Sequence, residues 1–290
     1  MRMKRSVDGR LDGSVDEGAV RAAWRARAFA AVAVAALAGG LAATAAADDG
    51  AASKEGAVAE LGDGFFIGTG LGVSILSDVK IRDVTPPPGE IAFGNAGVAA
   101  DVDAGFAWNI ELGFRLDESF SLAIESGFYR NGFGGFSSGE FTTDIGLSTA
   151  LVGGDGDFTQ IPVFFNALYE IPLVKPETPS AAGGLNLRIG GGLGLVHVAA
   201  DLDAIGAADV PGIFAAVDGS SWEFGGQLKI GLAYQISHAV ELGIEYRIMA
   251  VGGANFGPAT FSDPALVGFA DVETERVLTQ AVQARLSFEF

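Results

Sequence analysis

The chain ends in the stretch VQARLSFEF, Val282–Phe290, in which apolar and polar residues alternate at every position. Successive side chains of a β-strand point to opposite faces, so the stretch predicts a strand with one apolar and one polar face. Such an apolar face needs lipid or a protein core against it. The apolar face would carry Val282, Ala284, Leu286, Phe288 and Phe290, and the polar face Gln283, Arg285, Ser287 and Glu289.

The same period of two recurs along the chain and predicts eight strands. Long connections between them alternate with shorter ones, as in bacterial outer-membrane barrels with short periplasmic turns and long outer loops. The sequence therefore predicts an all-β protein, an eight-stranded antiparallel up-and-down transmembrane β-barrel with both termini in the periplasm. The predicted strands are 65–75, 103–116, 120–130, 158–171, 185–198, 222–236, 240–248 and 276–290, with long connections at 77–102, 131–157, 199–221 and 249–275 and shorter ones at 117–119, 172–184 and 237–239.

Two local features refine this prediction. Pro162 has no N–H to donate to a neighbouring strand, so it predicts a bulge or a locally broken pairing in the fourth strand. The long connections are rich in glycine and acidic residues, so we expect mobile surface segments there.

The distribution of glycine indicates which face of the barrel meets lipid. Glycines lie on the same face as the charged residues, and an eight-stranded barrel is so narrow that side chains fill its interior. Glycine on that face would make room for long Glu and Arg side chains. A soluble lipocalin-type barrel would need large apolar residues inside and varied polar residues outside, whereas the apolar face here carries almost no charge. We therefore expect the polar face inside and the apolar face against lipid.

The N-terminal region has the pattern of an export signal. Arg21, Arg25 and Arg27 precede an uncharged run, and Ala45-Ala46-Ala47 offers a cleavage site before Asp48. A transmembrane anchor is the alternative, but the run consists mostly of Ala and Gly, and a spanning helix needs about 20 strongly apolar residues. The predicted organisation is a signal peptide at 1–47, a short periplasmic leader at 48–63 and the outer-membrane β-barrel at 64–290.

Composition excludes one class of partner. Residues 48–290 keep 11 basic and 32 acidic residues, because residues 1–47 contain seven of the 18 Lys and Arg and four of the 36 Asp and Glu. Without a basic surface to neutralise phosphates, nucleic acid is not an expected partner. The chain has no cysteine, which fits export without requiring it.

Charged residues converge at mid-depth on the predicted inner face. Buried charges persist only when they are paired and hydrogen-bonded, so a salt-bridged plug across a dry lumen is the structural interpretation. The alternative is that some pairs gate a thin water-filled pore. The residues of this predicted network are Glu111, Glu125, Arg188, Lys229, Glu245, Arg247 and Arg285.

Aromatic residues cluster towards both ends of the predicted strands. Two aromatic girdles at the membrane interfaces are typical of transmembrane barrels, although aromatics are also common in strands generally. The loop-end girdle would contain Phe106, Trp108, Phe128 and Trp222, and the turn-end girdle Phe65, Phe120, Tyr169, Tyr234 and Phe290.

Three phrases carry a family resemblance. LGIEYR (Leu242–Arg247), QIPV (Gln160–Val163) and the closing RLSFEF (Arg285–Phe290) resemble the OmpA and OmpX type of eight-stranded outer-membrane barrels, which includes opacity-type surface proteins. The resemblance covers residues 64–290, and its motifs are degenerate. It implies a monomer with a role in surface interaction, adhesion or envelope integrity, although a fold does not fix the function. It also implies that Leu286, Phe288 and Phe290 form a signal for the barrel-assembly machinery. We expect no peptidoglycan-binding domain after the barrel, and therefore no full OmpA-like cell-wall tether.

Other functions remain as alternatives. The first is a small channel for ions or apolar solutes, and the second is a lipid A-modifying enzyme, since some eight-stranded barrels act on lipid A. His238 lies in a predicted turn, while His197 is the better candidate, but it lacks the hydroxyl of a His-x-Ser pair and a base within reach. We expect no enzyme activity, cofactor or metal site. The expected partners are outer-membrane lipid and lipopolysaccharide, to which divalent ions could bridge the loop carboxylates, and an extracellular ligand of the acidic loops.

Overall fold

The computed structural model describes residues 64–82, 87–175, 183–262 and 270–290. The predicted signal peptide and leader, 1–47 and 48–63, lie outside the described residues. The regular secondary structure of the described residues consists of strands alone. None of these residues forms a helix able to cross a membrane. The strands are β1 (Phe65–Leu76), β2 (Val79–Lys80), β3 (Ile91–Val102), β4 (Gly105–Arg115), β5 (Phe120–Thr143), β6 (Ser148–Val174), β7 (Leu185–Ala207), β8 (Val210–Ser237), β9 (Val240–Val251), β10 (Asn255–Pro258), β11 (Thr260–Phe261), β12 (Asp271–Glu273) and β13 (Val277–Glu289).

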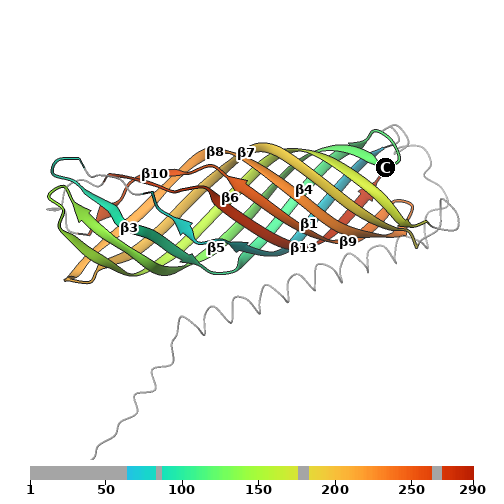
Figure 1. The fold of residues 1–290 in the computed structure, drawn as a ribbon. Coiled ribbons are helices and arrows are strands. Elements are labelled where there is room, and N and C mark those ends of the chain that lie inside the picture. Colours follow the sequence, from blue (N-terminus) through green and yellow to red (C-terminus); the bar gives the residue numbers. More distant parts are fainter. Residues whose placement is uncertain (1–63, 83–86, 176–182, 263–269) are drawn as a thin grey trace, which may run out of the picture. The chain divides into compact units, whose positions relative to one another are not determined.

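Antiparallel pairing closes the sheet into a barrel. The hydrogen-bonded order runs β5-β4-β1-β13-β9-β8-β7-β6, and β6 pairs with β5 to complete the ring. The terminal strand β13 lies between β1 and β9, with Gly70 opposite Arg285 and Arg285 opposite Gly243. Figure 1 shows the tilted strands, with β3 and β10 at one end and the C-terminus at the other. The predicted antiparallel all-β barrel is confirmed.

The two faces of the wall differ as the alternation predicts. In β6, Gln160, Asn166 and Glu170 are buried, whereas Phe165 and Tyr169, in the opposite phase, are 61% and 50% exposed. An apolar exterior around a polar interior is the arrangement of a membrane barrel, since lipid rather than water covers the outer face. Pairing between β5 and β6 is interrupted between Ser126–Val163 and Tyr129–Gln160, where Pro162 lies, and the register resumes unchanged. The predicted local break at Pro162 is therefore confirmed.

The long connections are not the mobile loops that the sequence predicts. Strands β5 to β8 continue well past the expected ends at Arg130, Phe158, Val198 and Trp222, and β3 occupies residues 91–102 of the first long connection. We call this part the outer tier. It comprises β2, the adjoining bridge residue Ile81, β3, β10, β11, β12 and residues 131–143, 148–158, 198–207 and 210–221 of β5 to β8.

The other four ring strands break where the outer tier begins. The breaks lie between β1 and β2, β3 and β4, β9 and β10, and β12 and β13, on four neighbouring strands of the ring. Backbone hydrogen bonds bridge them: Ser77 N donates to Leu278 O at 2.9 Å, Asp103 N to Gly132 O at 2.9 Å and Gly252 N to Phe224 O at 3.0 Å. In the described residues the wall thus stays hydrogen-bonded across these breaks.

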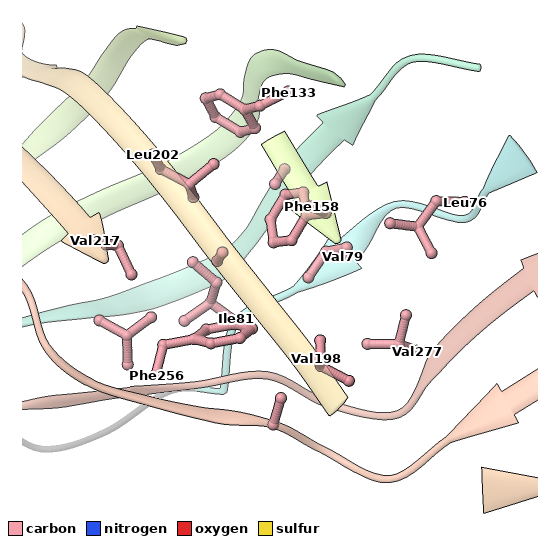
Figure 2. Packing of buried hydrophobic residues seen from close by; sticks show 14 of the residues in the cluster. Leu76, Val79, Ile81, Phe133, Phe158, Val198, Leu202, Val217, Phe256 and Val277 are labelled. Atoms are coloured by element: carbon pink, nitrogen blue, oxygen red, sulfur yellow. The ribbon is translucent and has the colours of Figure 1, made fainter. Parts of the chain in front are cut away.

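The interior of the outer tier is apolar. Side chains of Phe158, Val79, Ile81, Leu202 and Phe256 point toward one another there (Figure 2). The Phe158 ring lies 6.5 Å from that of Phe256 and 6.3 Å from that of Phe133, at the tilted and edge-on angles that aromatic pairs favour. This packing fills the outer end of the barrel with a hydrophobic core, while the interior below it is polar.

Candidate functional site: the charged barrel interior

A chain of six alternating charges crosses the middle of the barrel. Arg285 donates to Glu111 at 2.6 Å, Lys229 donates to Glu111 and also to Glu125 at 2.6 Å, and Arg247 donates to Glu125 and to Glu245 at 2.5 Å. All six are at most 6% exposed. The geometry thus brings together six of the seven residues of the predicted network.

Strand register explains why these charges meet. Glu111 and Glu125 are direct partners on β4 and β5, and Lys229 and Arg247 are direct partners on β8 and β9. Like charges directly opposite each other on neighbouring strands repel. Here the acidic pair on one wall contacts the basic pair on the other through Lys229 and Arg247, so each like-charge pair is neutralised across the lumen.

Polar side chains supply further hydrogen bonds to this network. Asn166 donates to Glu125 Oε2 at 3.2 Å, and Gln227 donates to Asn166 Oδ1 at 2.9 Å. Arg247 donates to the Tyr129 hydroxyl at 2.8 Å. Buried charges need such partners as well as counter-charges, because unsatisfied groups in a low-dielectric interior are costly.

Glycine makes room for these long side chains, as the sequence predicts. A Cβ on Gly68 would lie 2.4 Å from the Arg285 guanidinium. A Cβ on Gly70 would lie 2.2 Å from Asn109 Oδ1, and one on Gly192 would lie 2.0 Å from Asn166 Oδ1. Ordinary carbon contacts are well beyond these distances, so the space above these glycines on β1 and β7 is occupied by side chains of other strands.

Arg188 lies in a separate network at the turn end, not in the central one. It pairs with Glu170, its direct partner on the neighbouring strand, and lies 3.7 Å from Glu241. Arg115 lies 3.3 Å from Glu170 and 3.1 Å from Glu289. Sequence reasoning placed Arg188 at mid-depth and missed these four partners. The position of these residues along the predicted strands could have revealed the network. Arg188 is three residues after Leu185, where one strand begins, and Glu170 is one residue before Ile171, where the neighbouring strand ends.

The predicted girdle residues all lie on the outward face. Trp108, Trp222, Tyr169 and Tyr234 are exposed, and Phe106, Phe120 and Phe128 are half-buried in the same phase. Trp108 faces Phe128 across β4 and β5, and Phe120 faces Tyr169 across β5 and β6. Leu286, Phe288 and Phe290 of the predicted assembly signal are also on the outward side of the terminal strand. The girdle and assembly roles remain predictions.

The histidines are not arranged as a hydrolytic site in the described residues. His197 lies on the outer face beside its cross-strand partner Trp222, with ring centroids 5.2 Å apart. No hydrogen bond joins it to a hydroxyl or a carboxylate of a described residue. Ser221 is the partner of Val198, in the opposite phase, and His238 is exposed in a turn. No group of three or more His, Cys, Asp or Glu among the described residues could hold a metal ion.

Comparison with known proteins gives neighbours only at the level of structure. No family model and no curated protein matches the chain. Solved structures similar to it include Neisserial surface protein A, at 15% identity and a TM-score of 0.41 over 78% of this chain and 97% of that one. The outer membrane protein OprG of Pseudomonas aeruginosa is 14% identical, with a TM-score of 0.39 over 79% of this chain and 96% of that one. Ail of Yersinia pestis, in complex with a heparin analogue, is 12% identical, with a TM-score of 0.35 over 78% of this chain and 100% of that one. Similarity this low carries no argument about function.

The geometry itself defines the class. A closed antiparallel ring, an apolar outer face and a polar, charge-paired interior are the features of a bacterial outer-membrane β-barrel. The described residues of the chain have this fold.

Proposed function

We propose that the chain is a non-enzymatic outer-membrane barrel that presents a folded outer tier to the surroundings of the cell, with a role in surface interaction such as adhesion or envelope integrity. One observation carries the proposal. The hydrophobic core of this end of the barrel extends through the outer tier, where Leu202, Ile205 and Val217 are at most 3% exposed. A segment with such a core holds its surface in one conformation, as a recognition surface requires.

The lumen supports a structural role for the barrel. Its central charges form a closed set of three acidic and three basic residues, and the apolar core fills the outer end above them. Each of these six charges has a counter-charge, so the central set carries no net charge to attract an ion.

A small channel remains the second candidate, favoured by the polar inner face of the strands. Single-channel recording in planar bilayers separates the two functions. The proposal predicts no steady conductance above that of the bare bilayer, whereas regular unitary steps would favour the channel.

A lipid A-modifying activity is the third candidate, and the isolated position of His197 argues against it. Its test is the variant His197→Ala in the native host. The proposal predicts an unchanged lipid A mass spectrum with the wild-type protein, the variant and the deletion. A species lost in both the variant and the deletion would favour the enzyme.

The proposal also assigns partners. The apolar outer face would contact outer-membrane lipid and lipopolysaccharide, and the C-terminal strand would be read by the barrel-assembly machinery.

The first experiment is electrophoresis in SDS of the membrane fraction, with and without boiling. A closed membrane barrel resists SDS until heated, so the unheated protein should migrate differently from the boiled one. If the protein were found in the soluble fraction and migrated identically with and without boiling, the result would contradict the proposal and favour a lipocalin-like soluble binder.

A further inference from the structure

The outer tier carries an apolar surface patch. Val152, Gly206 and Phe214 are direct partners across β6, β7 and β8, and a Cβ on Gly206 would lie 3.2 Å from Val152 Cγ2 and 3.8 Å from Phe214 Cε1. Val152 and Phe214 therefore flank the glycine on one face, where they are 45% and 46% exposed. The turn between β5 and β6 carries two further exposed apolar side chains, Ile145 and Leu147, at 76% and 65%. Exposed apolar groups gathered in this way mark an interaction site.

Lipid is not the occupant of this patch. Asp157, Asp201 and Asp218 form a row of direct partners across the same three strands. The row separates the patch from the apolar belt that contains Leu195 and Trp222. Charged side chains are excluded from the lipid-facing hydrocarbon zone, so the row marks the outer limit of the belt. The patch thus lies on the aqueous side of the row.

The charge around the patch is of one sign. Asp155 and Asp203 are cross-strand partners immediately below it, Asp209 accepts a hydrogen bond from Thr149, and Asp144 precedes Ile145. None of these four carboxylates has a Lys or Arg within ion-pair distance among the described residues. The segments 77–102, 131–157, 199–221 and 249–275 contain 16 acidic and two basic residues. Among the described residues, these carboxylates thus have no basic partner, and Val152 and Phe214 remain exposed beside them.

We propose that this patch docks a cationic amphipathic polypeptide segment, in which apolar side chains cover Val152 and Phe214 and basic side chains pair with the surrounding aspartates. This inference rests on the proposed surface-display function and adds the chemistry of the partner. Apolar anchors supply most of the affinity of such interfaces, while complementary charge at the rim speeds association and selects the partner. The same charges exclude sulfated polysaccharides and other polyanions.

The test uses the full chain in nanodiscs of zwitterionic lipid and a fluorescent amphipathic peptide of lysine and leucine. Binding is measured by fluorescence anisotropy against empty nanodiscs. Val152→Ser with Phe214→Ser should weaken binding about tenfold or more, as truncated anchors do. Asp155→Asn with Asp203→Asn should weaken it about fivefold. The matched control, Asp78→Asn with Asp117→Asn, removes two exposed charges away from the patch, one after β1 and one in the short turn before β5, and should change affinity less than about twofold.

Two results would overturn the inference. One is wild-type affinity in the Val152 and Phe214 variant. The other is an equal loss in both aspartate variants, which would mean that total charge, not this patch, attracts the peptide. A second copy of the chain is the other possible occupant of the patch, and chemical cross-linking of the wild-type chain alone tests for it. Dimers that depend on the patch would assign the patch to a second copy and would also overturn the inference. Every variant is first checked for the heat-dependent SDS shift, so loss of the barrel is distinguished from loss of the docking site.

Discussion

Lys229 is the residue on which the central network depends most. It joins Glu111 to Glu125, which are direct partners on neighbouring strands. Replacing Lys229 by Met keeps the length of the side chain and removes its charge. Two carboxylates about 5 Å apart at an effective dielectric constant of 20 repel by about 3 kcal/mol. Breaking a buried pair from one side costs about 3–5 kcal/mol. Because Glu111 keeps Arg285 and Glu125 keeps Arg247, we expect a loss near the lower end, about 3 kcal/mol.

The assay is urea unfolding of the barrel in lipid vesicles, followed by the fluorescence of Trp108 and Trp222. Lys229→Met combined with Glu125→Gln restores electrical balance and should recover at least half of the loss. Leu228→Met, on the lipid-facing side of the same strand, is the matched control and should change the free energy of unfolding by less than about 1 kcal/mol. A loss below about 1 kcal/mol for Lys229→Met, or no recovery in the double variant, would refute the reasoning.

Three further predictions concern other parts of the molecule. Gly72→Ala places a methyl group 1.9 Å from the Val282 carbonyl oxygen on β13, so it should destabilise the barrel by about 1–3 kcal/mol in the same urea assay. Gly191→Ala meets only the Leu228 side chain and the Gln227 carbonyl at 3.1–3.2 Å and should cost clearly less; equal losses would contradict the packing argument. Phe158→Ala should remove about 3–5 kcal/mol of local stability and speed proteolysis of the outer tier while the heat-dependent SDS shift stays normal, and unchanged proteolysis would mean that the apolar core does not order this tier. Arg82→Ala breaks an exposed 2.8 Å pair with Glu273 and should change stability by less than about 1 kcal/mol, whereas a larger loss would assign that pair a structural role.

Alternation along the strands was enough to predict which side chains point inward. Glu111, Glu125 and Lys229 could be assigned to the lumen from their phase, because strand side chains have a period of two. Which charges meet across the lumen depends on register and on the stagger of the strands around the barrel. Arg188 shows the limit, since its phase was right but its depth was not.

The outer tier was missed for a physical reason. Gly153 and Gly154 have φ of 71° and 107°, and Ala204 has φ of 57°, all in the region that strands avoid. At these points the alternation between inward and outward side chains is interrupted. Asp155 and Val152 therefore both point outward, although they are an odd number of residues apart on β6. The period of two is lost there, and the glycine-rich, acidic segments resemble loops although they pair as strands.

We expect the outer tier to face the outside of the cell and the short turns to face the periplasm. The natural chain has no cysteine, so single-cysteine variants report one position each. Ser148→Cys lies in the outer tier and Glu118→Cys in an exposed short turn. With a membrane-impermeant maleimide on intact cells, we predict labelling of Ser148→Cys, and labelling of Glu118→Cys only after the outer membrane is permeabilised. The reverse pattern, or equal labelling of both on intact cells, would contradict the account.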